Sequence, residues 1–207
     1  MDFLTLQGKV ADWLNVTNLT AQIPDFINMA LHDIEGDWNY KCMEVRMTTS
    51  TADAYITMPP GYKDTKWFKV LVDTQYRNLA KDSSDNAIAN HPDLTNGTGP
   101  PEVFSTMTSS SEFLVRPTPD TTYTFEGIFY CYTADLSNNT DTNWWTINSW
   151  EALLFGALFF AAPFIKDDPR VATWKVYYDA ATKALRDAES NENIGGSPPT
   201  NKASFVV

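Results

Sequence analysis

Apolar residues follow one another almost without interruption near the C-terminal third of the chain. Every residue from 152 to 165 is apolar apart from Gly156 and Pro163. This run is shorter than the roughly 20 residues that a membrane-spanning helix requires, and it is typical of a buried helix. One helical stripe is formed by Trp150, Leu153, Leu154, Ala157, Leu158 and Ala161. Because Phe155, Phe159 and Phe160 lie outside that stripe, we expect the helix to be covered on more than one side.

A second helix is predicted after Pro163 ends the first. Asp168 and Pro169 suit its N-cap and its first helical position. A three-four spacing of apolar residues indicates one packing seam, formed by Val171, Trp174, Tyr178, Ala181 and Leu185. On its exposed side, Asp179 and Lys183 have the spacing and order that favour an ion pair. This part of the chain therefore predicts a helical hairpin.

The first forty residues predict two amphipathic helices. Asp2 or Thr5 caps the first helix, whose shared apolar face contains Leu6, Val10, Trp13 and Leu14. Pro24 begins the second helix, whose stripe consists of Ile23, Ile27, Ala30, Leu31, Ile34 and Trp38. Asp33, Glu35 and Asp37 are expected on its solvated faces. Since these seams match those of the later pair, we expect one bundle of helices from both chain ends.

The period of the pattern changes to that of strands after residue 43. Residues 44–51 and 54–58 predict a hairpin, and residues 66–73 place Phe68, Val70 and Val72 on one face. Residues 83–90 predict a short helix capped by Ser84. Further strands are predicted at residues 102–107 and 112–116. Residues 123–132 are mostly apolar on both faces, so that strand is expected either in the centre of a sheet or covered on two sides.

These patterns predict an α+β fold with three parts. Residues 1–43 and 144–190 form a helical bundle built from both chain ends, and residues 44–143 form an inserted antiparallel β region. Residues 191–207 form an extended C-terminal arm, since Gly195-Gly196-Ser197-Pro198-Pro199 is incompatible with regular structure. The arm ends in the apolar residues Phe205, Val206 and Val207. We expect it to become ordered on a partner and to bury Phe205; a frayed terminus is the alternative.

Charge and cysteine content narrow the possible functions. With 43% apolar and 20% charged residues, the chain has the composition of a globular protein. Its net charge of −11 argues against a protein that grips nucleic acid through phosphate contacts. The same charge suits a surface that lets DNA pass. Cys42 and Cys131 are expected to be free buried thiols, and the first residues lack the pattern of a signal peptide.

No catalytic, cofactor-binding or metal-binding residues are predicted. His32 and His91 are far apart and lack further ligands at suitable spacing. Residues 109–111 are serines without the small-residue elbow of a nucleophile, and there is no glycine-rich phosphate loop. Asp167-Asp168 suits a helix cap better than an acid pair.

Aromatic residues are the more informative feature, with seven Trp and nine Tyr in the chain. Trp144 and Trp145 suit packing in the core, anchoring at an interface, or a platform for a sugar. For Phe155, Phe159 and Phe160, the pattern leaves core and interface both open.

Three blocks of sequence resemble the phage head-to-tail adaptor proteins, in that family's order. The first is FLTLQGKVADWLN with LTAQIPDFINMALHDIEGDW, and the second is FLVRPTPDTTYTFEGIFYCYTADLS. The third is TNWW followed by EALLFGALFFAAPFIKDDPRVATWKVYYDAATKAL. Together they cover roughly half to two thirds of the chain; residues 61–111 show no clear match.

The resemblance implies a structural virion protein at the head–tail junction, assembled in the host cytoplasm. Proteins of this family form a ring, usually dodecameric, between the portal protein and the tail nozzle protein, and tail fibres are a further possible partner. DNA passes through the ring without sequence-specific binding, and no membrane is involved. In this picture the bundle builds the ring and channel wall, the β region faces outward or toward tail components, and Phe205 on the arm reaches the portal. Alternatives are a small non-catalytic module that binds glycan or protein through its β insertion, and an enzyme with an unrecognised site.

Overall fold

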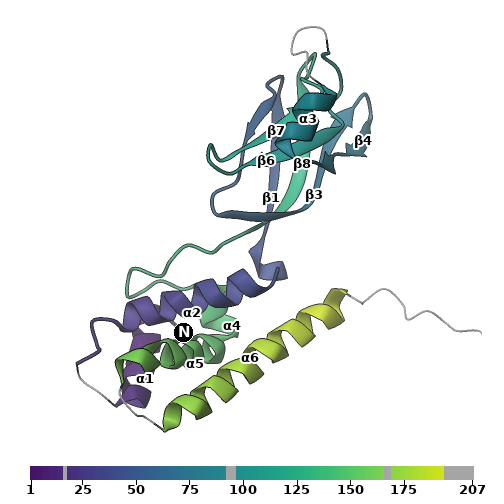
Figure 1. Ribbon diagram of the computed structural model, residues 1–207. Coiled ribbons are helices and arrows are strands. Elements are labelled where there is room, and N and C mark those ends of the chain that lie inside the picture. The colour runs from purple at the N-terminus through teal and green to yellow at the C-terminus, as the bar shows by residue number, and fades with distance from the viewer. Residues whose placement is uncertain (16–17, 92–96, 166–168, 194–207) are drawn as a thin grey trace, which may run out of the picture. The chain divides into compact units, whose positions relative to one another are not determined.

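The computed structural model describes residues 1–15, 18–91, 97–165 and 169–193 (Figure 1). They form two compact units. The first comprises Met1–Cys42 and the chain from Ala134 onward, and the second comprises Met43–Thr133. The first unit is helical and the second contains two β-sheets, so the predicted α+β class is confirmed.

Helices α1 (Phe3–Leu14) and α2 (Ile23–Asp37) open the helical unit. The Asp2 carboxylate caps α1 by accepting a hydrogen bond of 2.9 Å from the backbone N–H of Thr5. Hydrogen bonds from the side chain and the backbone of Thr5 lower the pKa of the Asp2 carboxyl. Helix α1 ends at Asn15, whose φ of 52° places it in the left-handed region. The predicted apolar stripes are buried, except that Trp13 and Trp38 are exposed.

The predicted C-terminal hairpin consists of α5 (Trp150–Ala161) and α6 (Arg170–Asn193), preceded by the short helix α4 (Trp144–Asn148). Helix α5 ends earlier than the apolar run because Pro163 falls in a 3-10 turn, η2 (Ala162–Phe164). Asp168, the predicted N-cap of α6, lies outside the described residues.

Helix α5 contacts α1, α2 and α6, which surround it in Figure 1. Its predicted stripe from Leu153 to Ala161 is buried, whereas Phe155, Phe159 and Phe160 are only partly covered. The rest of the helical unit therefore leaves part of these three side chains accessible.

Residues 134–143 belong to the helical unit, although the sequence pattern places them in the β insertion. The Asn28 side chain exchanges two hydrogen bonds of 3.0 Å with the backbone of Leu136. The backbone N–H groups of Phe3 and Leu4 donate to the carbonyls of Asp141 and Asn139. These bonds tie the segment to α1 and α2, and no periodicity in the sequence reports them.

The β unit contains two four-stranded sheets, with strand orders β1-β8-β3-β4 and β2-β7-β6-β5. In the first sheet, β1 (Glu44–Thr51) and β3 (Tyr62–Val72) flank the central strand β8 (Tyr123–Cys131), and β4 (Gln75–Asn78) forms an edge. The central position of β8 confirms the prediction from its two apolar faces. The second sheet contains β2 (Tyr55–Thr57), β5 (Ala80–Lys81), β6 (Val103–Met107) and β7 (Glu112–Arg116).

A shared core of phenylalanines joins the two sheets. Phe68, Phe125 and Phe129 of the first sheet pack with Phe104 and Phe113 of the second. The rings of Phe113 and Phe129 stack with centroids 5.0 Å apart. Inward-facing rings at alternate positions thus hold the sheets face to face.

The predicted hairpin of residues 44–51 and 54–58 is wrong. Strand β1 pairs with β8, and β2 pairs with β7 in the other sheet. Between them, Asp53 donates its N–H to the Thr51 hydroxyl and accepts from the N–H of Tyr55 through its carboxylate. These bonds stabilise a turn that carries the chain from one sheet to the other.

Three smaller predictions about the β unit also need correction. Helix α3 (Ser84–Asn90) is capped by Ser83, not by Ser84. The unit is not wholly antiparallel, because β5 and β6 pair in parallel. Strands β4 and β5 were not predicted, because their exposed polar residues show no clear alternation.

None of the described helices combines the length and hydropathy needed to cross a membrane.

Two glycines in helices test how closely the helical unit is packed. A Cβ atom at Gly156 of α5 would lie 2.6 Å from the Ala30 Cβ and 2.9 Å from the Tyr178 ring, whereas nothing lies within 4 Å at Gly8 of α1. We expect Gly156→Ala to lower the free energy of unfolding by about 1–3 kcal/mol. Gly8→Ala should raise it by roughly 0.5–1 kcal/mol. Denaturation followed by helical circular dichroism measures both, and equal effects would contradict the close contact.

Candidate functional site

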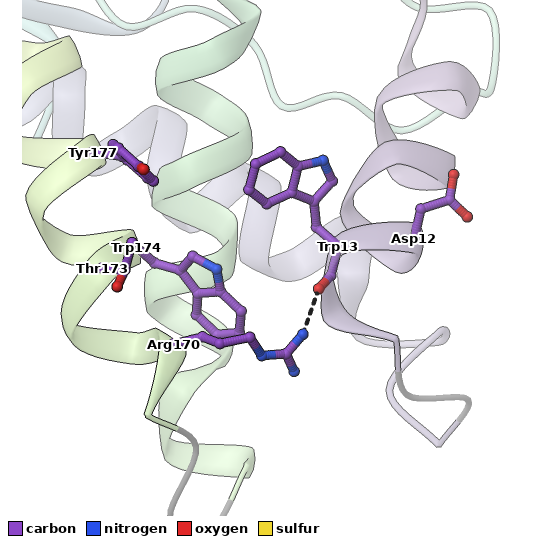
Figure 2. Close-up of a pocket in the computed structure, with 6 residues that line it drawn as sticks. All are labelled: Asp12, Trp13, Arg170, Thr173, Trp174 and Tyr177. Carbon is purple, nitrogen blue, oxygen red and sulfur yellow. Dashed lines mark hydrogen bonds between the residues drawn. The ribbon is translucent and has the colours of Figure 1, made fainter.

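An aromatic pocket of about 570 Å³ lies between α1 and α6 (Figure 2). We call it the α1–α6 pocket; its lining residues are Asp12, Trp13, Arg170, Thr173, Trp174 and Tyr177. Trp13 and Tyr177 are each 46% exposed. Exposed apolar side chains that lie next to one another often mark sites of protein interaction, and aromatic residues are frequent anchors of protein interfaces.

Arg170 forms one end of the pocket and connects the two helices. Its guanidinium donates hydrogen bonds of 3.0 Å to the carbonyls of Trp13 and Leu14, in the last turn of α1. A cation at this position also interacts favourably with the helix dipole. The same guanidinium lies 5.0 Å from the Trp174 ring. Arg170 thus holds the first turn of α6 against the end of α1.

Phe155 of α5 contacts the two exposed aromatic side chains of the pocket. Its ring lies 5.6 Å from that of Trp13 in an edge-to-face contact and 5.1 Å from that of Tyr177. The exposed rings are therefore held by a partly buried third ring.

Trp145 of α4 lies in the core of the helical unit and donates a hydrogen bond of 2.7 Å from Nε1 to the Glu35 carboxylate. Glu35 is only 1% exposed, so its predicted position on a solvated face is wrong. The apolar stripe of α2 predicted which side of the helix is buried. It could not show that Trp145, far away in the sequence, donates a hydrogen bond to Glu35 on that buried side. A buried carboxylate requires such a partner.

Other acidic residues of α2 hold α6 in place. The Tyr178 hydroxyl donates to Asp33 at 2.6 Å, and Arg186 forms an ion pair with Asp37 at 2.7 Å. Burial and this bond to Asp33 raise the pKa of Tyr178. The predicted pair of Asp179 with Lys183 is replaced by two others, Lys175 with Asp179 and Lys183 with Asp187.

A second accessible surface contains residues of α2 and α5 and the segment after Ala134. We call it the α2 face; it surrounds a shallow pocket lined by Asp25, Met29, His32, Asp135 and Phe160 among others. Met29 is 48% exposed. His32 lies 2.6 Å from Asp135, and the other predicted surface histidine, His91, forms the C-cap of α3.

The candidate interface residues have different environments. Trp144 is 44% exposed, whereas its neighbour Trp145 is fully buried; the pair therefore does not present two faces to a sugar. Phe159 stacks on Tyr178 and Phe160 lines the α2 face. Phe205, Val206 and Val207 lie outside the described residues.

The remaining titratable groups include few that lie close to one another within the described parts of the chain. No group of three or more His, Cys, Asp and Glu residues there is placed to hold a metal ion. Cys42 is half-buried and Cys131 is buried, and both are free thiols. Burial, together with the nearby carboxylates of Glu35 and Glu189, raises the pKa of Cys42 to about 12.

Exposed aromatic residues on a helical scaffold place this chain among proteins whose surfaces are adapted to contacts with other proteins. It belongs to a family of phage head-to-tail adaptors: the family model described as SU10 adaptor protein matches residues 1–200. The match includes residues 61–111, where no resemblance was recognised. No individual curated protein matches the chain.

Membership of this family confirms the resemblance and defines the general role of the protein. It is a structural protein of the phage virion, located at the head–tail junction, where it interacts with portal and tail components.

Adjacent tryptophans offer a matched test of the buried hydrogen bond. Trp145→Phe removes the donor to Glu35, so we expect the free energy of unfolding to fall by about 1–3 kcal/mol. Trp144→Phe changes an exposed ring and should alter it by less than about 0.5 kcal/mol. Urea denaturation compares them, and similar losses would contradict the assigned role of the Glu35–Trp145 bond.

The Tyr178–Asp33 bond predicts a dependence on alkaline pH. Because the pKa of Tyr178 is raised above the ordinary tyrosine value of about 10, the contribution of this bond to stability is complete below pH 10 and is lost as pH rises through the raised pKa. The stability difference between the wild type and Tyr178→Phe should therefore be constant from neutral pH to about 10 and shrink at higher pH. Denaturation at a series of pH values measures this difference, and one that grows above pH 10 would be inconsistent with the bond.

Proposed function

We propose that this protein forms a ring, dodecameric as is usual in the resembling family, between the portal and the tail nozzle. There it extends the DNA channel and provides docking sites for tail components. The observation that carries the proposal is the accessible aromatic surface of the helical unit, in a chain that belongs to an adaptor family. Partner contacts would remove Trp13, Tyr177 and the partly covered α5 phenylalanines from water, which is favourable in proportion to the apolar area buried.

The helical parts, residues 1–43 and 144–190, are proposed to act as one bundle that builds the ring. A ring requires a head-to-tail contact between two different surfaces of the same subunit. The α1–α6 pocket and the α2 face share no lining residue and lie on one unit, which supports this role. The β unit, Met43–Thr133, is proposed to face outward or toward tail components, with tail fibres as a further partner.

The C-terminal arm is proposed to contact the portal. Residues 191–193, which the sequence pattern placed in this arm, belong to α6, so the proposal concerns the residues that follow Asn193. Phe205, Val206 and Val207 are an apolar group on an otherwise polar segment, and burying them on a partner offsets the entropy lost on ordering the arm.

An acidic lumen is proposed to let DNA pass without sequence-specific binding. The chain has 26 acidic and 15 basic residues, and like charges repel the phosphate backbone. A structure of the assembled ring with a neutral or basic lumen would contradict this part of the proposal.

Co-sedimentation with the portal ring of the same phage tests the proposed assembly. We expect the full-length chain to sediment with the portal at about one copy per portal subunit if the two rings match in symmetry. A chain that stays a free monomer would contradict the proposed function and favour the binding-module alternative, to be tested by a glycan screen of residues 43–133.

The arm is tested in the same assay with Phe205→Ala and Phe205→Leu as a matched pair. We expect Phe205→Ala to weaken portal binding by roughly tenfold or more, since truncating a buried aromatic anchor typically costs 2 kcal/mol or more. Phe205→Leu keeps an apolar side chain and should bind more tightly than Phe205→Ala. Equal portal binding by the wild type, Phe205→Ala and Phe205→Leu would contradict the proposal that the arm contacts the portal.

A further inference from the structure

The two accessible surfaces of the helical unit differ in charge. The α1–α6 pocket contains the guanidinium of Arg170, and Lys9 lies one turn before Trp13 on α1 with its ammonium 4.8 Å from the Trp150 ring. Asp12 supplies one negative charge there. On the α2 face, three carboxylates line the pocket, those of Asp25, Asp33 and Asp135. Asp33 accepts a hydrogen bond from Tyr178, and Asp135 lies 2.6 Å from His32. One surface is therefore more positive and the other more negative.

Their apolar centres are also complementary. The α1–α6 pocket presents the rings of Trp13 and Tyr177, both nearly half exposed. At the α2 face the accessible apolar residues are Met29 and Phe160. A methionine side chain is flexible and polarisable, and its sulfur makes favourable contacts with aromatic rings. Met29 is thus suited to insertion between two rings of a neighbouring molecule.

We propose that the α2 face of one copy docks on the α1–α6 pocket of the next copy. Met29 contacts Trp13 and Tyr177 of the neighbour, while Asp25 and Asp135 face its Arg170 and Lys9. This inference rests on the proposed ring and assigns the residues that form the contact between its subunits. Because the two surfaces are different and lie on one unit, the contact is head-to-tail and leaves each surface used once in a closed ring.

A second copy fits this pocket better than an unrelated chain because the complementary charges and the apolar centre occur on the same molecule. Opposite charges at the rim orient the approach of the two copies, and apolar contact at the centre supplies most of the affinity. If a portal or tail segment occupies the pocket instead, the experiment below shows no link between copies.

Cysteine cross-linking tests this contact on the assembled complex. The double variant Met29→Cys with Tyr177→Cys is assembled on the portal ring of the same phage and treated with a short bis-maleimide. We expect a ladder of covalent oligomers of this chain in denaturing gels. Both substitutions are at exposed positions, so each variant should retain the wild-type fold. Sedimentation with the portal ring is measured for each variant before cross-linking.

Three controls distinguish a head-to-tail contact from other arrangements. Each single variant alone should give no link above the wild-type background, which accounts for the native Cys42 and Cys131. An equal mixture of the two single variants should give dimers but no longer oligomers. A link formed by one single variant alone would overturn the proposal, because such a link joins the same surface on both copies, whereas the proposed contact joins two different surfaces.

A charge variant provides an independent measurement. Met29→Asp adds a negative charge at the centre of the α2 face, where the proposed contact is apolar, and we expect at least a tenfold loss in the apparent affinity of this chain for the portal ring. Normal sedimentation of the double variant with the portal but no covalent ladder would overturn the contact while leaving the proposed function intact. Failure of the wild type to bind the portal would overturn both.

Discussion

The helical unit depends on the burial of α5. This helix has apolar residues on all sides, so it is stable in water only when other helices cover it. Helices α1 and α2 from one end of the sequence and α6 from the other supply that cover. Gly156 shows how close the contact is, because even a methyl group there would collide with Ala30 and Tyr178. Segments from both ends of the sequence thus form one unit although the β unit, Met43–Thr133, separates them along the chain.

Helix α6 is attached differently from the helices around it. Among its residues only Trp174 and Tyr178 are buried apolar side chains, and much of its attachment is polar. Arg170 bonds to the end of α1, Tyr178 bonds to Asp33, and Arg186 pairs with Asp37. The Glu189 side chain also accepts a hydrogen bond from the backbone N–H of Lys41. Of the three aromatic residues of α6, Tyr177 stays accessible for contacts with another molecule.

The β unit has a hydrophobic core of its own. Phenylalanines at alternate positions hold two sheets together, and the chain changes sheets between β1 and β2. As an independent unit it is suited to present a separate surface, while the helical unit carries the contacts proposed within the ring.

Sequence by itself determined the helices, most of the strands and the apolar faces, because these follow from local periodicity. The nearly all-round hydrophobicity of residues 152–165, a cap at Asp2 or Thr5 and the apolar faces of β8 were visible in this way, and the family was recognisable from the order of three blocks. Contacts between residues far apart in the sequence could not be predicted from these patterns. The pairing of β1 with β8, the bond from Trp145 to the buried Glu35, and the pocket between Trp13 and Tyr177 were decided by tertiary structure. Each joins segments far apart in the chain, and local patterns report which face a residue occupies but not which residue it meets across that face.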